Sequence, residues 1–409
     1  MHENEQTLLY WGAIISVGSN KLITREEKQK HPREYIVATH WPALAKVVKE
    51  DPTILNNIGI YRVNCSHLGK ESDLKSLAEY LRTLHPFVPI LIDLQGPKPR
   101  IHETMPGAGG IPVKIGDRFE VTYESGDSEN RFCEPWKLRV CFPEIVEVME
   151  AGDTVIFDDG KMTAKVQEKS EKKAIIECME ILNGDEIFIL GGRKWICVRN
   201  KPLGIECITA HDRKSIEFAR DILGFKYVDN IMVSYFSTPS DIEHFVKIIR
   251  DEYSYTGNLG GKFETPHAVY NIDQILDLDD LTLAMFGRWD LRVEMDPRAV
   301  SNMHDIQVHF FHSCQKHNVE SICATGFLES MLTADGRVTP AEIGDMQISM
   351  RTGADHLMLS GESTYGAQAR ACIELECQYQ RDMHKKLKSG EITYKKTPDS
   401  GLGELLHIL

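Results

Sequence analysis

Short apolar segments alternate with amphipathic segments along most of this 409-residue chain, and this alternation restricts the fold more than any other feature. Eight apolar segments have the length and composition of buried strands. They are Tyr35–Thr39, Gly59–Val63, Pro89–Leu94, Asn230–Ser234, Asn258–Lys262, Leu281–Phe286, Glu320–Ala324 and His356–Ser360. Eight strands with intervening helices predict an α/β protein with a closed (β/α)₈ barrel, the TIM-barrel architecture.

The amphipathic segments between the strands predict the outer helices of the barrel. They are Ser72–Leu84, Arg213–Leu223, Ser240–Asp251, Asp305–His317, Pro340–Thr352 and, as the last helix, Gln368–Leu387.

The third β/α unit is interrupted after Pro97–Arg100, where the sequence changes character. Short strand-like segments follow, separated by turn sequences. The strand candidates are Lys114–Tyr123, Thr154–Phe157 and Ala174–Glu180, and the turns are Asp158-Asp159-Gly160 and Asn183-Gly184-Asp185. These patterns predict an all-β domain at 101–205, inserted after the third strand as a lid. Residues 1–100 and 206–387 then form the barrel, and 388–409 a tail.

The bulk composition excludes some classes of protein. A net charge of −14 argues against general binding to nucleic acid or to an anionic membrane, since both require clustered positive charge. Leu8–Val17 is too short to span a membrane, which takes about 20 residues. The ten cysteines form no CxxC pair. A cytoplasmic protein is the expectation.

Polar residues follow several of the predicted strands, where barrel enzymes carry their reactive groups. They are Arg62, Asn64, Ser66, His67, Asp93, Lys262, Glu264, Asp290, Thr325 and Glu362. Glu264 and Asp290 come from neighbouring strand ends, and two carboxylates with open positions suit Mg²⁺. Arg62 could donate paired hydrogen bonds to a phosphoryl group. The residues alone predict a metal-assisted barrel enzyme that acts on an anionic substrate.

At these residues the chain resembles the pyruvate kinase family over about 33–385. Six ordered motifs carry the resemblance, and Thr39 and Pro42 fit a further, first-strand nucleotide motif. The six are Ile60-Tyr-Arg-Val-Asn-Cys-Ser-His67, Ile92-Asp-Leu-Gln-Gly-Pro-Lys-Pro-Arg100, Lys262-Phe-Glu264, Gly287-Arg-Trp-Asp-Leu-Arg-Val-Glu294, Ile322-Cys-Ala-Thr-Gly-Phe-Leu-Glu-Ser-Met331 and Met358-Leu-Ser-Gly-Glu-Ser363.

The resemblance implies phosphoryl transfer between phosphoenolpyruvate and ADP. Glu264 and Asp290 would hold Mg²⁺, for which Mn²⁺ could substitute, and Lys262, Arg62 and Thr325 would be catalytic. The remaining implied sites are the monovalent-cation site at Asn64, Ser66 and Asp93, and the nucleotide contacts of Thr39, His67 and Arg100.

Several positions depart from the family pattern. Trp289 and Arg292 replace glycines beside Asp290, Gly326 replaces a polar residue, and Tyr365 stands where many members have a nucleotide-contacting lysine. These changes predict an altered substrate pocket. Lys98 replaces an acidic residue, and a fixed ammonium there predicts that K⁺ is not required. The resemblance ends before the family's C-terminal domain, so this domain and its allosteric regulation are expected to be absent.

Three alternatives to a phosphoenolpyruvate-dependent kinase stay open. One is an ATP-dependent kinase of another small organic acid. The second is a Mg²⁺-dependent lyase or aldolase, against which Arg62 and the lid argue. The third is a non-catalytic regulator, against which intact Lys262, Glu264, Asp290 and Thr325 argue. A homodimer through the barrel helices is compatible with the sequence, although no residue points to it.

Overall fold

The computed structural model describes residues 22–30, 34–40, 42–70, 74–102, 110–123, 133–134, 136–182, 184–189 and 194–393. The apolar segment Leu8–Val17, the turn residue Asn183 and tail residues 394–409 lie outside the described residues.

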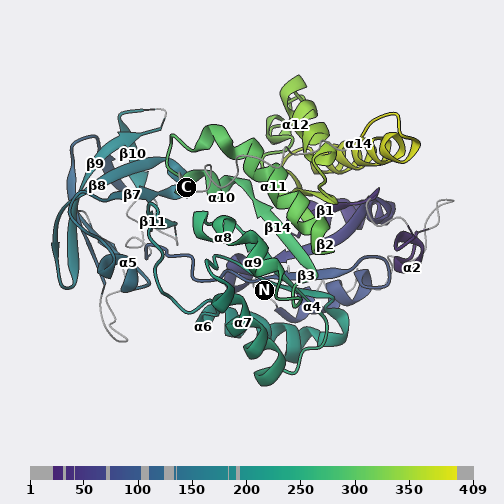
Figure 1. The fold of residues 1–409 in the computed structure, drawn as a ribbon, viewed down its shortest axis with the longest axis horizontal. Coiled ribbons are helices and arrows are strands. Elements are labelled where there is room, and N and C mark those ends of the chain that lie inside the picture. Colours follow the sequence, from purple (N-terminus) through teal and green to yellow (C-terminus); the bar gives the residue numbers. More distant parts are fainter. Residues whose placement is uncertain are drawn as a thin grey trace, which may run out of the picture.

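Parallel strands close into a barrel at the centre of the larger unit (Figure 1). In the described part of the chain the order around it is β1-β16-β15-β14-β13-β12-β3-β2. The strands are β1 (Ile36–Thr39), β2 (Ile58–Asn64), β3 (Ile90–Asp93), β12 (Asn230–Val233), β13 (Asn258–Phe263), β14 (Leu283–Gly287), β15 (Glu320–Ala324) and β16 (His356–Leu359). Each coincides with one of the predicted strand segments, so the predicted (β/α)₈ fold is confirmed.

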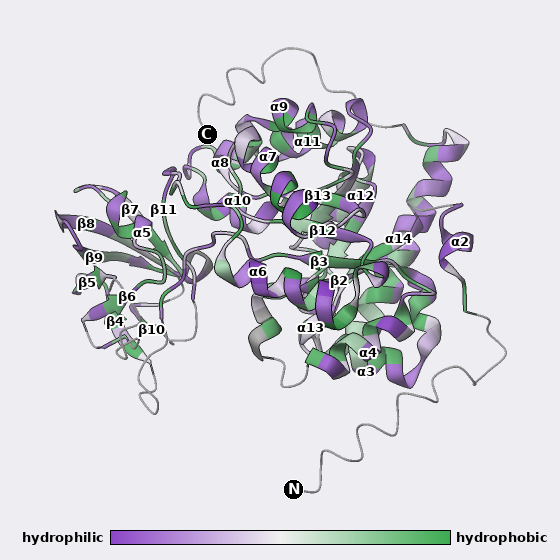
Figure 2. Cartoon of the chain, turned by 90° about the horizontal axis from the view of Figure 1, so that it is seen from below, coloured by the Kyte–Doolittle hydropathy of each residue, from purple (hydrophilic) through white to green (hydrophobic). Residues whose placement is uncertain are grey.

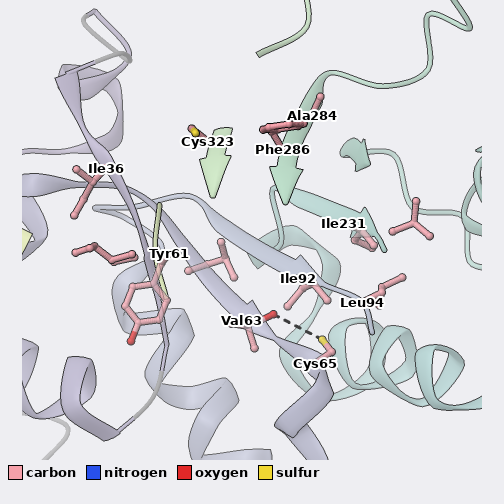
Figure 3. Close-up of a cluster of buried hydrophobic side chains, with 14 of the residues drawn as sticks. Ile36, Tyr61, Val63, Cys65, Ile92, Leu94, Ile231, Ala284, Phe286 and Cys323 are labelled. Atoms are coloured by element: carbon pink, nitrogen blue, oxygen red, sulfur yellow. Dashed lines mark hydrogen bonds between the residues drawn. The ribbon is translucent and has the colours of Figure 1, made fainter. Parts of the chain in front are cut away.

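Alternate residues along each strand face the barrel interior and the surrounding helices. Val37, Leu91 and Met285 belong to the cluster that fills the barrel. Their sequence neighbours, such as Ile36, Ile92 and Phe286, belong to the layer beneath the helices (Figure 3). At the carboxyl ends of the strands, the positions that continue this inward-facing series are polar. These are Thr39, Arg62, Asp93, Ser234 and Lys262.

Helices cover the outside of the barrel (Figure 1). The main ones are α3 (Pro42–Glu50), α4 (Leu74–Leu84), α6 (Ala210–Glu217), α7 (Pro239–Lys247), α8 (Pro266–Tyr270), α9 (Ile272–Leu276), α11 (Met303–Lys316), α12 (Pro340–Arg351) and α14 (Ala369–Ser389). Several begin with a threonine whose side chain accepts a backbone N–H, as Thr238 and Thr339 do, followed by proline in the first turn. The predicted helix Arg213–Leu223 corresponds to the end of α6 and a π-helical turn at Phe218–Leu223.

A mainly antiparallel β-domain is inserted between β3 and β12, and we call it the inserted domain (Figure 2). Its strands are β4 (Ile111–Lys114), β5 (Arg118–Thr122), β6 (Lys137–Arg139), β7 (Thr154–Phe157), β8 (Met162–Ser170), β9 (Lys173–Ile181), β10 (Glu186–Ile189) and β11 (Ile196–Val198). It buries a hydrophobic core of its own, which includes Val121, Val155 and Ile176. The predicted single strand Lys114–Tyr123 is wrong, because a turn at Gly116 separates β4 from β5. The boundaries proposed at 100/101 and 205/206 stay predictions.

The inserted domain packs against α10 (Arg288–Glu294), the helix that follows β14. A small apolar cluster joins Ile156, Trp195 and Cys197 of the inserted domain to Tyr235 and Val293 of the barrel. The contact places the inserted domain over the carboxyl ends of the barrel strands. Among the residues that the structure describes, no helix combines the length and the apolar character needed to cross a membrane.

Candidate active site

Three charged side chains meet inside the barrel at the carboxyl ends of β2, β3 and β13. Arg62 donates a hydrogen bond from Nε to Asp93 Oδ2 over 2.6 Å, and Lys262 Nζ lies 3.7 Å from the same oxygen. Ser234 Oγ donates to Asp93 Oδ1 over 3.2 Å. Asp93 is 1% exposed, so it is a buried counter-charge that holds Arg62 and Lys262 in place.

Thr39 supports the same group. Its Oγ1 accepts a hydrogen bond from Arg62 Nη1 over 2.9 Å and donates to the carbonyl of Leu359 over 2.9 Å. Its side chain is buried and therefore positions Arg62.

The two predicted metal-binding carboxylates lie beside this cluster. Glu264 Oε2 is 3.1 Å from Lys262 Nζ but accepts no hydrogen bond from any residue that the structure describes. Gly287 makes room for this carboxylate, since a Cβ there would lie 2.9 Å from Glu264 Cβ. Asp290 lies in the first turn of α10. The described residues contain no group of three or more His, Cys, Asp or Glu side chains arranged to hold a metal. Two carboxylates suffice for Mg²⁺, which usually keeps waters and substrate oxygens as its other ligands.

Lys98, which the sequence predicted to replace a monovalent cation, lies beside Asp290. Its ammonium forms an ion pair with Asp290 and lies over the rings of Trp195, at 4.7 Å, and Tyr235, at 5.2 Å. The contact is therefore with a predicted metal ligand. At Asp93 the ammonium that the structure places is that of Lys262.

A cleft with a volume of about 500 Å³ opens where these groups meet. Most of the predicted site residues line it, namely Arg62, Asn64, Ser66, Lys98, Arg100, Lys262, Glu264, Trp289, Asp290, Thr325, Gly326 and Tyr365. Thr39, Asp93 and Arg292 are outside its lining, and the side chain of His67 lies outside the described part of the structure. Residues far apart in the chain are thus collected on one side of the barrel.

The positions that depart from the family pattern form one wall of the cleft. Trp289 is 41% exposed and Tyr365 72% exposed, although both are large apolar side chains. Arg292 acts on this wall through Trp289, since its guanidinium lies 5.3 Å from the indole ring. Thr325 and Gly326 both have positive φ angles, of 68° and 81°. Thr325 Oγ1 donates to the carbonyl of Ala324 over 2.6 Å.

The inserted domain contributes residues to the cleft that the sequence did not single out. Lys194 and Trp195 of the inserted domain line the cleft, and Lys194 Nζ lies 2.8 Å from Asp158 Oδ1. The hydrogen bonds from Lys194 and Lys161 lower the pKa of Asp158 despite its burial. Only the way the two domains pack together brings these two residues to the cleft, so no local sequence signal could have identified them.

The buried site contains both positively and negatively charged side chains. Burial works to lower the pKa of Lys262, but the carboxylates of Asp93 and Glu264 outweigh it and raise the pKa, so the side chain is an ammonium. Burial raises the pKa of Glu264. Burial acts in the same direction on Asp290, but Lys98 and Lys262 hold its pKa below the usual value. Glu362, another residue of the cleft, has its pKa raised to about 7 by burial.

The chain is similar to known proteins over most of its length. The family model described as the barrel domain of pyruvate kinase matches residues 31–373. A pyruvate kinase of Agrobacterium vitis is 29% identical over 347 residues, which cover 84% of this chain and 66% of the relative. A pyruvate kinase of Staphylococcus aureus is 28% identical over 343 residues, which cover 83% of this chain and 55% of the relative. The chain thus spans about half to two thirds of the length of these relatives.

The crystal structure of a pyruvate kinase from Cryptosporidium parvum has the same fold. It superposes with a TM-score of 0.71 at 21% sequence identity, over 90% of this chain and 73% of that one.

Proposed function

The chain belongs to the pyruvate kinase family, and on this premise we propose that it transfers a phosphoryl group between phosphoenolpyruvate and ADP. One observation carries the proposal. Two fixed cations, Arg62 and Lys262, and two carboxylates, Glu264 and Asp290, line one cleft beneath the inserted domain. Phosphoryl transfer requires this combination, since it depends on positioning and on neutralising the charge of the transferred group.

The reaction breaks the bond between phosphorus and the enol oxygen and forms a bond from phosphorus to a β-phosphate oxygen of ADP. The enolate that is left takes up a proton on its methylene carbon and becomes pyruvate. Arg62 would bind the phosphoryl oxygens, with Thr39 and Asp93 fixing its orientation. Lys262 would stabilise the enolate oxygen as an ammonium. Thr325 would lie beside the methylene carbon, and Arg100, with His67, would contact the nucleotide.

Glu264 and Asp290 would hold Mg²⁺ or Mn²⁺. The residues fit, because Glu264 has a buried oxygen that no described residue uses in a hydrogen bond. When bound, the metal would neutralise charge on the phosphoryl oxygens.

We further propose that the enzyme does not require K⁺. The carboxylate of Asp93 already has Arg62 and Lys262 as counter-charges, and Lys98 adds a fixed ammonium nearby. Asn64 and Ser66 would then have a structural role, since Ser66 donates its N–H to Asn64 Oδ1 over 3.1 Å.

In a second candidate function the chain also transfers a phosphoryl group, but the substrate is a different small carboxylic acid. Trp289 projects its indole into the wall where a glycine would leave space, so a different small carboxylic acid would be phosphorylated by ATP. This candidate rests on the exposed indole and on Tyr365 in the same wall.

A coupled assay with phosphoenolpyruvate, ADP and Mg²⁺, run beside ATP with a series of small carboxylic acids, tests both candidates. Lys262→Met is the inactive control, and Lys226→Met changes a distant lysine by the same amount. Pyruvate formation that is lost in Lys262→Met and kept in Lys226→Met supports the first candidate. Turnover only with ATP and another acid supports the second, and no turnover in either direction would overturn the proposal.

A further inference from the structure

The side chain of Lys98 holds one of the two carboxylates that we propose as metal ligands. Its ammonium forms an ion pair with Asp290 Oδ1, and only 15% of the lysine side chain and 23% of the aspartate side chain are exposed. Both residues line the cleft described above. One carboxylate oxygen of Asp290 is therefore already bonded to a cation of the chain itself, in a place where little water screens the charges.

Three ion pairs balance the charges where the carboxylates and cations of the site meet. They are Lys98–Asp290, Lys262–Glu264 and Arg62–Asp93. A divalent metal held by Glu264 and Asp290 would add two positive charges to this balanced site. These charges would repel an ammonium that stayed on Asp290, because like charges that share a poorly solvated carboxylate are weakly screened. The carboxylate therefore has two competing cationic partners, the metal and Lys98.

The backbone at Lys98 is anchored on both sides, so only its side chain has to move. Gly96 donates its N–H to Asp212 over 3.1 Å, and the carbonyl of Pro99 accepts the N–H of Ile196 over 3.1 Å. A proline on each side of Lys98 restricts the backbone further. The ammonium can therefore leave the carboxylate by rotation about the bonds of its own side chain, without movement of the chain.

Two aromatic rings give the same ammonium a second contact. Lys98 Nζ lies over the ring of Trp195, at 4.7 Å from its centroid, and over that of Tyr235, at 5.2 Å. Trp195 belongs to the inserted domain and Tyr235 to the barrel, and both side chains are buried. A cation is attracted to the face of such a ring, and more strongly where water is excluded. The ammonium can therefore stay over the two rings after it leaves the carboxylate.

We propose that Lys98 is an internal competitor of the divalent metal, and that its ammonium moves from Asp290 onto the faces of Trp195 and Tyr235 when the metal binds. This inference rests on the metal assignment in the proposed function. Lys98 thereby sets the affinity for the metal, because the metal binds only the fraction of molecules in which Asp290 is released. If Lys98 holds Asp290 about nine-tenths of the time, the apparent affinity is about tenfold below the intrinsic one.

Electron paramagnetic resonance of free Mn²⁺, recorded on the full chain without substrates, measures this affinity through binding and not through turnover. Lys98→Met should lower the Kd for Mn²⁺ by about tenfold relative to the native protein. Lys194→Met is the matched control, since it removes a lysine of the same cleft whose ammonium is 37% exposed and pairs with Asp158. At an ionic strength of about 0.15 M the control should change the Kd by less than about twofold. An equal gain in the two variants would mean that only the general potential of the cleft matters, and would overturn the proposal.

Glu264→Gln separates this inference from the proposed function. The variant should weaken Mn²⁺ binding by at least about tenfold, alone and combined with Lys98→Met, because an amide replaces a carboxylate ligand. If Mn²⁺ binding is the same in Glu264→Gln as in the native protein, the metal assignment fails and the inference fails with it. If Glu264→Gln weakens binding but Lys98→Met does not strengthen it, the metal assignment stands and the competition by Lys98 is refuted.

Indole fluorescence follows the movement of the ammonium in the native protein. Titration with Mg²⁺ should change the emission, because the charge shifts relative to the Trp195 ring. The change should disappear in Lys98→Met and be strongly reduced in Trp195→Phe, which keeps an aromatic face for the cation. A change of the same size in Lys98→Met, or no change in the native protein at saturating Mg²⁺, would show that the metal does not displace Lys98.

Discussion

The barrel buries charged side chains at both of its ends, and the two ends satisfy them to different degrees. At the amino-terminal end, His356 donates from Nδ1 to the carbonyl of Tyr35 over 2.8 Å and from Nε2 to Glu320 over 2.6 Å. Lys28 donates to the carbonyls of Leu55 and Ile58. Each ring nitrogen of His356 and the amino group of Lys28 thus has a partner within the chain.

The carboxyl-terminal end is only partly satisfied. Asp93 is surrounded by donors, but Glu264 keeps a buried oxygen without a hydrogen bond, and Asp290 relies on a lysine at the foot of the inserted domain. The difference teaches that buried charges whose hydrogen bonds are complete within the chain stabilise the fold, whereas the carboxylate oxygen of Glu264 that lacks a hydrogen bond lines the cleft. Substitutions at the two ends of the barrel should therefore differ in their effects on turnover and on stability.

Glu264→Gln should cause the largest change. Losing one metal ligand removes several kcal/mol of charge stabilisation, so turnover should fall by about 10³-fold. The melting temperature should stay the same or rise, because a neutral amide replaces a buried carboxylate. Steady-state kinetics and thermal denaturation of the same preparation measure both effects. A variant that keeps its turnover would contradict the metal assignment.

Asp93→Asn tests whether a buried charge at the carboxyl-terminal end of the barrel also stabilises the fold. The substitution removes the counter-charge of the buried Arg62 and leaves Lys262 with Glu264 alone, so the free energy of unfolding should fall by about 3–5 kcal/mol. Denaturant titration measures the loss, with Asp221→Asn, an exposed carboxylate, as the neutral control. If both variants are equally stable, Asp93 is not the structural counter-charge of the site.

Glu320→Gln should destabilise the protein only while His356 carries a proton. Burial works to lower the pKa of His356, but Glu320 and the carbonyl of Tyr35 outweigh it and raise the pKa above its usual value of about 6.5. The stabilisation is therefore complete below about pH 6.5 and disappears as the pH rises through the higher folded-state pKa. We expect a loss of about 1–3 kcal/mol at pH 6 and a smaller one at pH 9.

Denaturant titrations at the two pH values measure this difference. Glu206→Gln, which removes the carboxylate partner of the exposed His244, is the matched control and should show no pH-dependent loss. Turnover should be unaffected by Glu320→Gln, and a large drop would mean that the two ends are not separate.

Trp289→Gly should raise kcat/KM for phosphoenolpyruvate by about tenfold, the scale of effect of relieving a steric misfit in a pocket. Trp136→Gly, which removes an exposed tryptophan of the inserted domain, is the control. A decrease, or no change, in the Trp289 variant would show that the indole does not block the pocket.

The choice of monovalent cation should have the smallest effect. Initial rates should be equal in Na⁺, K⁺ and tetramethylammonium buffers, because Arg62, Lys262 and Lys98 supply the fixed positive charge. A strong requirement for K⁺ would show that this charge does not replace a bound cation.

The sequence predicted the barrel well because its strands are short, continuous apolar segments separated by amphipathic helical segments. The interior positions of Arg62, Asp93 and Lys262 came from the structure. The inserted domain was predicted less well, since β8 (Met162–Ser170) buries only Met162, Ala164 and Val166 and is polar over its second half. Its strands depend on pairing with each other.

Site residues at the ends of the barrel strands were predicted from the sequence. Site residues that reach the cleft only through the packing of the two domains were missed. Lys194 and Trp195 reach the cleft only because the inserted domain packs on α10. The ion pair of Lys98 with Asp290 could not be predicted from the sequence, because a long side chain selects its partner in three dimensions. Arg292 lies outside the cleft for the same reason, since its position on α10 directs it over Trp289.

Phosphorus NMR of the protein with phosphoenolpyruvate, ADP and Mg²⁺ tests the central claim most directly, because it follows the transferred atom itself. We predict that the phosphoenolpyruvate signal decreases while the γ-phosphate signal of ATP grows in equal amount, and that neither change occurs with Glu264→Gln. Release of inorganic phosphate without ATP, or transfer that persists in Glu264→Gln, would contradict the assignment of phosphoryl transfer to this cleft.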